Sequence, residues 1–258
     1  MSKSQARLSL IEAFALVVVL GAVAFTMHQL RLRQHHYFSL NALDELQRTL
    51  GHYKLSERSS RNHEELIIRD YFQDQRGGTF LDVGANHYRD DNNTYYLETA
   101  LGWSGLAVDA LAEYAEGYAK HRPRTTYVAM FASDVMDEKA RVFVPMRDKK
   151  EASISKEILG PVSKVLATER EVPTTTLNHA LDAAGLTSLD FMSMDIELSE
   201  PKALAGFDVE RYRPRLVCIE SHLQVRQQIL DYFARHGYVL IGKYLRLDPY
   251  NLYFAPLR

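Results

Sequence analysis

Short apolar runs alternate with helical patterns along most of this chain. The runs at 79–83, 105–108, 125–130, 141–145, 189–194 and 215–220 predict strands, and 94–101, 111–121, 177–184 and 224–236 predict helices. The runs at 238–244 and 252–255 predict a closing antiparallel hairpin, and the polar stretch 146–172 predicts an irregular segment. Strands that alternate with helices are typical of a mostly parallel, doubly wound α/β sheet. We therefore expect that fold class for the body of the chain.

Composition excludes some classes of function. Of the 258 residues, 46% are hydrophobic and 25% are charged, as in ordinary globular proteins. Lys and Arg number 31 against 33 Asp and Glu, so there is no basic excess for a phosphate backbone, and we expect no nucleic-acid partner. The single cysteine, Cys218, excludes an internal disulfide and a multi-cysteine zinc site.

The N-terminus contains an uncharged, mostly apolar stretch. Residues 13–30 approach the length that crosses a bilayer, with Lys3 and Arg7 before them and Arg31 and Arg33 after. We expect one transmembrane helix at about 12–30. The alternative is a secretory signal peptide cleaved near the small-residue site at 22–24. An anchor is favoured because the apolar run continues past that site, whereas the flanking charges leave the orientation open.

The pattern divides the chain into three parts. Residues 1–36 form the expected membrane anchor. Residues 37–76 have leucines and aromatic residues at helical spacing, which predicts a helical juxtamembrane connector. The two glycines at 77–78 end that pattern, so residues 77–258 are the expected main domain.

Polar residues follow the first three predicted strands, where doubly wound sheets bind ligands. Gly84 permits a tight turn after the first strand, although the dinucleotide fingerprint with three glycines is absent. Asp109 ends the second strand, at a distance from Gly84 that suits a carboxylate binding two ribose hydroxyls. Ser133 and Asp134 follow the third strand, where their side chains could contact the edge of the ligand's adenine. The alternative is that they form a turn or cap a helix.

Acidic residues follow the next two strands. Asp195 and Glu197 lie two residues apart, as do Glu220 and His222, so each pair shares one face of its strand. If the strands are neighbours, the four side chains converge into a divalent-metal site or an acid–base cluster. The alternative is that Glu197 or Glu220 caps a helix or pairs with Arg211 or Arg215.

These motifs together resemble a known family. Phe80-Leu81-Asp82-Val83-Gly84-Ala85-Asn86 and Gly105-Leu106-Ala107-Val108-Asp109 are similar to the first two motifs of FkbM-type methyltransferases. Thr174-Thr175-Thr176-Leu177 and the segment Leu189 to Glu197 resemble that family's later signatures. The resemblance covers about residues 79–255. It implies a Rossmann-like class I methyltransferase that binds S-adenosylmethionine and methylates an oxygen of a small molecule or sugar.

The resemblance also implies roles for individual residues. Asp82, Gly84 and Asn86 would surround the methionine part of the cofactor, and Asp109 would hold its ribose. Ser133 or Asp134 would lie near the adenine, and Asp195 beside the sulfonium and the acceptor. The chain departs from the family pattern at three places: His87 follows Asn86 where a glycine is common, Ser193 replaces a frequent lysine, and Leu198-Ser199 replace a glycine and an alanine.

We therefore expect an O-methyltransferase with a small-molecule or glycan acceptor. His222 and His87 are the candidate bases, since histidine titrates near working pH. A cation such as Mg²⁺, if bound, would be held by Asp195, Glu197 and Glu220 and would acidify the acceptor hydroxyl. The alternative function is a non-catalytic, membrane-tethered binding or trafficking module that retains the fold. A nicotinamide-dependent oxidoreductase is disfavoured by the missing glycines.

The function implies a location. S-adenosylmethionine is made in the cytosol, so we expect a single-pass membrane protein whose catalytic domain faces that side. The alternative is a secreted or periplasmic protein after signal cleavage. The sequence leaves the acceptor and the oligomeric state open.

Overall fold

The computed structural model describes residues 19, 21–23, 25–27, 48, 50–51, 53, 59–146, 149, 152–153 and 166–257. The chain has two compact units, Met1–Thr49 and Leu50–Arg258, and the second contains all the sheets. In the first unit, 21–23 and 25–27 are helical. None of the described helices is both long and apolar enough to span a bilayer. Most of the expected span lies outside the described residues.

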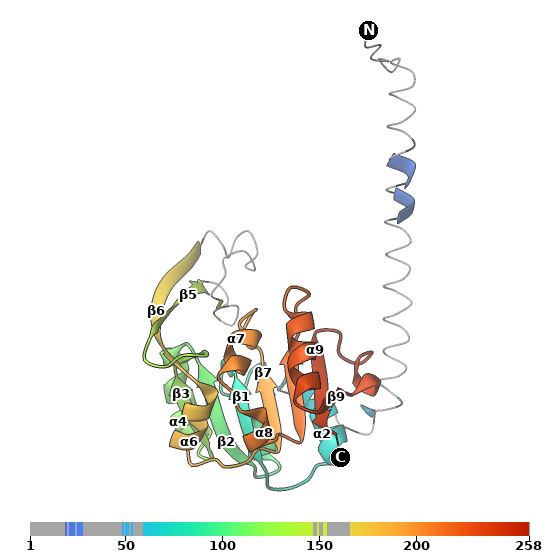
Figure 1. Ribbon diagram of the computed structural model, residues 1–258. Coiled ribbons are helices and arrows are strands. Elements are labelled where there is room, and N and C mark those ends of the chain that lie inside the picture. Colours follow the sequence, from blue (N-terminus) through green and yellow to red (C-terminus); the bar gives the residue numbers. More distant parts are fainter. Residues whose placement is uncertain are drawn as a thin grey trace. The chain divides into compact units, whose positions relative to one another are not determined.

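The second unit is built on a seven-stranded sheet (Figure 1). Its strands follow the order β3-β2-β1-β7-β8-β10-β9. The first five are parallel, whereas β10 runs antiparallel to both β8 and β9. The bounds are β1 Thr79–Val83, β2 Ser104–Asp109, β3 Thr125–Ala129, β7 Phe191–Met194, β8 Leu216–Glu220, β9 Tyr238–Leu240 and β10 Asn251–Pro256. The expected doubly wound sheet with a C-terminal antiparallel hairpin is confirmed.

Helices cover both faces of this sheet. The bounds are α2 Glu64–Phe72, α3 Tyr95–Thr99, α4 Ala115–His121, α6 Leu177–Ala183, α7 Glu200–Ala205, α8 Val209–Tyr212 and α9 Arg226–Arg235, with 3-10 turns at Ala112–Tyr114 and Gly242–Tyr244. Leu81, Met192 and Val217 on one face of the sheet pack against residues from α6 to α9 in the main core. On the other face, Tyr118 of α4 packs on Ala85 and Ala107, and α2 contacts β8.

The face that carries α2 and α4 is unusually polar. Because side chains alternate along a strand, Asp82 and Ser193 point away from the main core. The register pairs Asp82 with Ser193 and Ser193 with Cys218. Asp82, Ser193 and Cys218 therefore form a row of polar groups across the centre of the sheet.

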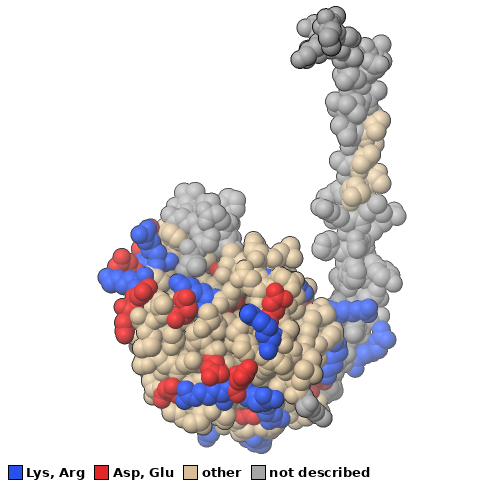
Figure 2. All heavy atoms as spheres, in the orientation of Figure 1, with Lys and Arg blue, Asp and Glu red and all other residues tan. Residues whose placement is uncertain are grey.

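A second, three-stranded sheet has the order β4-β6-β5. It consists of β4 Phe131–Ala132, β5 Lys139–Pro145 and β6 Ala167–Thr175, and β5 pairs antiparallel with β6 to form an arm. Figure 2 shows basic and acidic side chains intermingled on this side of the molecule, consistent with the ion pairs Lys139–Glu171 and Arg141–Glu169.

The arm corrects one expectation. Residues 146–172 were expected to be irregular throughout, but the strand β6 begins at Ala167. The segment Ala167–Thr175 contains four charged or threonine residues before Val172, and most of its side chains are solvent-accessible. An exposed strand needs no apolar run, so hydrophobic periodicity does not reveal it.

Candidate active site

A cleft opens at the carboxyl ends of β1, β2 and β7. Gly84, Asn86, Asp109 and Asp195 line it together with Phe131 and Ala152. Strand β1 lies between β2 and β7, so the strand order reverses beside it. Doubly wound sheets bind their ligands at the point where the strand order reverses. Four residues that the sequence indicated separately are therefore brought into one cleft.

Gly84 allows two segments of backbone to lie unusually close. Its φ is 77°, in the left-handed region that favours glycine. A Cβ at this position would lie 1.8 Å from the carbonyl oxygen of Asp195. Only glycine therefore permits the turn after β1 to pack directly against the end of β7. Both segments line the cleft.

Asp109 organises the next part of the cleft. Its Oδ2 accepts a hydrogen bond from the amide of Asn86 at 2.9 Å, and its Oδ1 accepts one from the amide of Leu111 at 2.8 Å. Burial raises its pKa to about 6, although these hydrogen bonds oppose the rise. A carboxylate oxygen has two lone pairs, so Asp109 still has acceptor capacity for ligand hydroxyls.

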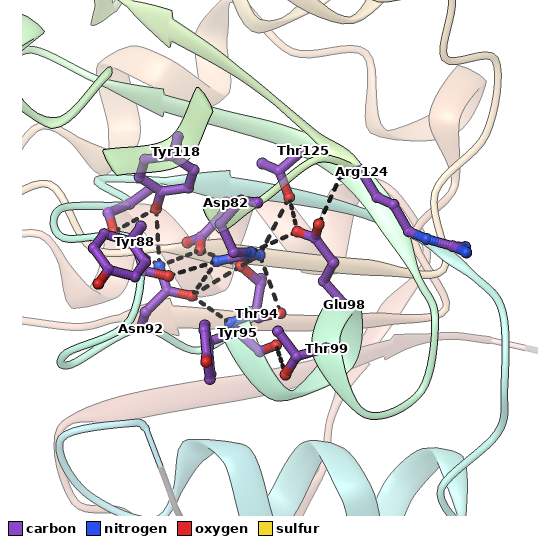
Figure 3. A network of polar contacts seen from close by, with 12 residues as sticks. Asp82, Tyr88, Asn92, Thr94, Tyr95, Glu98, Thr99, Tyr118, Arg124 and Thr125 are labelled. Atoms are coloured by element: carbon purple, nitrogen blue, oxygen red, sulfur yellow. Dashed lines mark hydrogen bonds and ion pairs between the residues drawn. The ribbon is translucent and has the colours of Figure 1, made fainter. Parts of the chain in front are cut away.

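Asp82 is not among the residues that line the cleft and belongs instead to a buried network of polar contacts (Figure 3). Its Oδ2 accepts hydrogen bonds from the Thr94 hydroxyl at 2.8 Å and the Asn92 side-chain amide at 3.4 Å. Burial raises its pKa to about 6, and these hydrogen bonds together with the charge of Arg122 oppose the rise. The carboxyl group holds the loop after β1 in place.

Arg122 is the centre of that network, and nothing in the sequence indicated it. Its guanidinium is buried and pairs with Glu98. It also donates hydrogen bonds to the Asn92 side chain, to the Tyr88 and Thr94 carbonyls, and to the Thr94 and Thr125 hydroxyls. We name this set the arginine network: Asp82, Tyr88, Asn92, Thr94, Glu98, Tyr118, Arg122 and Thr125.

The acidic residues beyond β7 and β8 converge as expected. His222 Nε2 lies 3.3 Å from Glu197 Oε2 and 3.1 Å from Glu220 Oε2. The ligand atoms of these three residues lie within 4.8 Å of one another. Met194 pairs with Ile219 across the two strands, so Asp195 follows beside Glu220, and their carboxyl groups are hydrogen-bonded. We call Asp195, Glu197, Glu200, Glu220 and His222 the acidic cluster.

The alternative partners of these carboxylates are engaged elsewhere. Arg211 pairs with Asp182, and Arg215 pairs with Asp190. Neither arginine forms an ion pair with Glu197 or Glu220 in the described part of the chain. Glu197 and Glu220 therefore do not draw positive charge from these two arginines.

Crowding and burial shift the pKa values of the cluster upward. Burial raises the pKa of Glu220 far above its usual range, and the negative charges of Asp195, Glu197 and Glu200 add to the effect. Burial and the charge of Glu197 raise the pKa of Asp195 to about 6. The surrounding protein explains the raised pKa, yet the Asp195 side chain is still exposed to solvent where it lines the cleft.

Several polar atoms near the cluster have no hydrogen-bond partner. Glu200 is fully buried; its Oε1 accepts a hydrogen bond from the amide of Ile196, whereas its Oε2 has no partner. The other buried oxygens without a hydrogen bond among the described residues are Glu220 Oε2, Ser199 Oγ and Ser221 Oγ. The contact of Glu220 Oε2 with His222 is thus a charge contact only. Such groups are rare in folded proteins and are most common at functional sites.

Three candidate residues lie apart from this cluster. His87 Nδ1 accepts hydrogen bonds from the amides of Arg89 and Asp90 at 3.4 and 3.1 Å, so this nitrogen stabilises its own turn. Ser133 is fully buried and bonded to Asp134, whose carboxylate lies 3.7 Å from Lys202. Neither Ser133 nor Asp134 lines the cleft, where Phe131 and Ala132 stand instead.

The sheet order and the glycine turn define a Rossmann-like α/β fold with a ligand cleft at the carboxyl ends of its strands. A family model described as the Methyltransferase FkbM domain matches residues 82–240, and the chain belongs to that family. A search of curated proteins finds no match.

Solved structures with a similar arrangement are methyltransferases of low identity. A TehB-like S-adenosylmethionine-dependent methyltransferase from Corynebacterium glutamicum is 13% identical, with 87% of this chain and all of that chain covered and a TM-score of 0.43. A putative rRNA methylase from Clostridium thermocellum is 8% identical over 74% and 94% of the two chains, with a TM-score of 0.42. A Geobacter sulfurreducens S-adenosylmethionine-dependent methyltransferase, solved with S-adenosyl-L-homocysteine, is 9% identical over 80% and 78%, with a TM-score of 0.37.

Proposed function

We propose that this protein methylates a hydroxyl oxygen of a small molecule or sugar. One observation carries the proposal: the imidazole of His222 is held between Glu197 and Glu220, next to Asp195 at the wall of the cofactor cleft. A hydroxyl acceptor must lose a proton when it is methylated, and an accessible imidazole at this position is suited to take it.

The residues of the cleft fit S-adenosylmethionine. Asp109 has acceptor capacity for the two ribose hydroxyls, and the turn at Gly84 brings backbone close to any ligand in the cleft. Asp195 and its acidic neighbours complement a positively charged sulfonium and ammonium. When bound, S-adenosylmethionine supplies a methyl group on a positively charged sulfur.

The residues of the acidic cluster then have distinct tasks. Because Nε2 of His222 faces the two carboxylates, the other ring nitrogen, Nδ1, takes the proton from the acceptor hydroxyl. Glu197 and Glu220 hold the ring and stabilise the imidazolium that forms, as a carboxylate does beside a catalytic histidine. Asp195 lies at the boundary of the cleft and the cluster, where it orients the acceptor toward the cofactor. Alignment of acceptor and methyl group supplies the largest part of the acceleration.

A divalent cation is the alternative way to activate the hydroxyl. Glu197, Glu220 and His222 offer one ligand atom each, and Asp195 lies beside them. The base role fits the donor set better than Mg²⁺ does, because Mg²⁺ prefers oxygen ligands in octahedral geometry. Removal of cations with EDTA separates the two: the base mechanism predicts unchanged transfer, and loss of transfer restored by added Mg²⁺ would favour the metal.

Cofactor binding is tested with S-adenosylhomocysteine by calorimetric titration. We expect Asp109→Ala to weaken binding by about 1–3 kcal/mol, because the variant removes acceptors for buried ligand hydroxyls. Asp182→Ala is the matched control, since its carboxylate pairs on the surface with Arg211. Equal affinity of the Asp109 variant and the wild-type protein would contradict the assignment of the cleft.

Catalysis is tested by transfer of labelled methyl from S-adenosylmethionine to a panel of sugars and small alcohols. We expect His222→Gln to lower transfer about 10²- to 10⁴-fold without changing S-adenosylhomocysteine affinity. His236→Gln is the control, because His236 pairs with Glu210 on the surface. Full activity in a Glu220→Ala, His222→Ala variant would remove the cluster from the mechanism. Cofactor binding without transfer to any acceptor would favour a non-catalytic binding or trafficking module.

The acceptor and the location are part of the same proposal. The net charge of −2 favours a small-molecule or glycan acceptor over a nucleic acid. We propose that residues 13–30 tether the protein to a membrane with the catalytic domain in the cytosol. Protease digestion of sealed membranes tests this: a C-terminal tag should be degraded, and its protection would indicate a periplasmic or lumenal domain.

A further inference from the structure

Arg61 lies on a short segment, Ser59 to Asn62, that is tied to the body at both ends. At one end, the amide of Asn92 donates a hydrogen bond to the carbonyl of Ser59 at 3.1 Å. Asn92 also donates to the carbonyl of Ala85, so this end of the segment lies beside the loop after β1. That loop is the one that begins at Gly84 and forms part of the cleft.

The other end of the segment is tied to the far side of the acidic cluster. The amide and side chain of Asn62 both donate to the carboxylate of Glu64, at 2.8 and 3.0 Å. That carboxylate also accepts a hydrogen bond from Asn251 at 3.3 Å, and Asn251 pairs with Glu220 across β10 and β8. Arg61 is therefore held between the loop after β1 and the strand that carries Glu220.

The guanidinium of Arg61 is exposed and unpaired, although the segment that carries it is well anchored. Within the described parts of the chain, no hydrogen bond or ion pair engages it. It nevertheless lies close enough to the cleft for its positive charge to act on Asp195, where it opposes the rise in pKa that burial causes. Among the described residues, Arg61 is thus an exposed, unpaired positive charge on a backbone segment that is anchored beside the loop after β1.

The charges of S-adenosylmethionine indicate which of its groups this guanidinium binds. The methionine part of the cofactor has a positive sulfonium, a positive ammonium and a negative carboxylate. The acidic cluster complements the two positive groups and repels the carboxylate. His222 is the proton acceptor in the proposed function, whereas Arg61 is a cation whose charge reaches Asp195 and which has no ion pair within the described part of the chain.

We propose that Arg61 binds the carboxylate of the cofactor's methionine part and so fixes the position of the reacting sulfur. A guanidinium suits this task because it donates two parallel hydrogen bonds to a carboxylate. The inference rests on the proposed function, since it takes the cleft to be the cofactor site. It extends that site to a residue outside the matched family domain, which begins at Asp82.

The test compares two ligands that differ only in the carboxylate. Calorimetry measures the affinity of S-adenosylhomocysteine and of its decarboxylated analogue for the full chain and for Arg61→Gln. We expect the wild-type protein to prefer S-adenosylhomocysteine, and the variant to lose about 10- to 100-fold in affinity for it while binding the analogue as before. Arg61→Lys should retain part of the preference, because a lysine keeps the charge but not the paired geometry.

Two controls make the outcomes distinguishable. Arg211→Gln removes an equal charge from an exposed ion pair and should leave both affinities unchanged. Asp109→Ala should weaken both ligands alike, since it acts on the ribose. An Arg61 variant that keeps the wild-type preference overturns the inference, as does one that weakens both ligands equally. If the wild-type protein binds neither ligand, the proposed function itself fails.

Discussion

The arginine network and the acidic cluster occupy neighbouring positions on one sheet, yet they differ in how far their buried charged groups have hydrogen-bond and ion-pair partners. In the arginine network, the carboxylates of Asp82 and Glu98 face a buried guanidinium whose donors are all directed at acceptors. In the acidic cluster, Glu197 and Glu220 both contact the imidazole of His222, and Glu200 and Glu220 each keep an oxygen without a hydrogen bond.

The difference separates a structural role from a functional one. A buried polar network whose members are all satisfied makes its surroundings rigid. Buried carboxylates that repel one another are unfavourable in the folded state, and such groups with raised pKa values are concentrated at functional sites. The arginine network therefore supports the loop after β1, whereas the acidic cluster is the region that binds the cationic cofactor and the acceptor in the proposed function.

Removal of Arg122 should have the largest effect on stability. Arg122→Met leaves Glu98 without its cation and several acceptors without a donor, so we expect a loss of about 3–5 kcal/mol in the free energy of unfolding. Denaturant unfolding measures it. Arg124→Met is the matched control, because that exposed side chain donates only to the Gly102 carbonyl and should cost below about 1 kcal/mol. Similar losses in the two variants would mean that the network is not a stabilising unit.

Gly84 joins the two regions, and its replacement should have the second-largest effect. Gly84→Ala places a Cβ against the carbonyl of Asp195 in a backbone conformation that alanine disfavours. We expect a loss of about 2–4 kcal/mol, of which about 1 kcal/mol comes from the conformation and the rest from the clash.

A second glycine isolates the clash. Gly185 has nearly the same φ, 71° against 77°, but a Cβ there would meet nothing within 4 Å. Gly185→Ala should therefore lose only the conformational part, and S-adenosylhomocysteine binding should weaken in the Gly84 variant alone. Equal unfolding free energies for the two variants would show that the backbone at Gly84 moves aside freely.

The sequence predicted those parts of the molecule that local patterns determine. Apolar runs gave the strands of the central sheet, and residues that follow such strands, among them Gly84, Asp109 and Asp195, meet in one cleft because parallel strands end at one edge. The same logic predicted the convergence of Glu197, Glu220 and His222 once β7 and β8 are neighbours.

What the sequence did not predict depends on contacts between distant residues. Arg122 follows α4 in an ordinary polar stretch, and only the fold brings Glu98 and Asn92 around it. Arg61 lies before the domain that the motifs define, and hydrogen bonds to Asn92 and Asn251, through Ser59 and Glu64, place its segment beside the cleft. The amide of Ser133 donates to the Thr175 carbonyl, so the chain after β4 turns toward β6, a strand without an apolar run.

The acidic cluster should affect the pH dependence of stability. The effect is smaller than those of the Arg122 and Gly84 variants, and here the substitution should stabilise the protein. Burial raises the pKa of Glu200 to about 7, and the charges of Asp195 and Glu197 contribute. Because the folded-state pKa lies above the value of about 4.5 expected for the unfolded chain, the stability linked to its proton is complete below pH 4.5 and is lost as the pH rises through 7. The full loss amounts to about 3 kcal/mol.

Glu200→Gln should remove this share of the pH dependence. The glutamine keeps an oxygen for the amide of Ile196 and cannot ionise, so the variant should gain about 2 kcal/mol relative to wild type between pH 5 and pH 8. Unfolding free energies at four pH values in that range measure the gain. Asp182→Asn is the control, because Arg211 lowers the pKa of that exposed carboxyl and any slope has the opposite sign. Parallel curves for wild type and Glu200→Gln would mean that Glu200 finds a partner for its charge, and the contrast with the arginine network would then rest on Asp195, Glu197 and Glu220 alone.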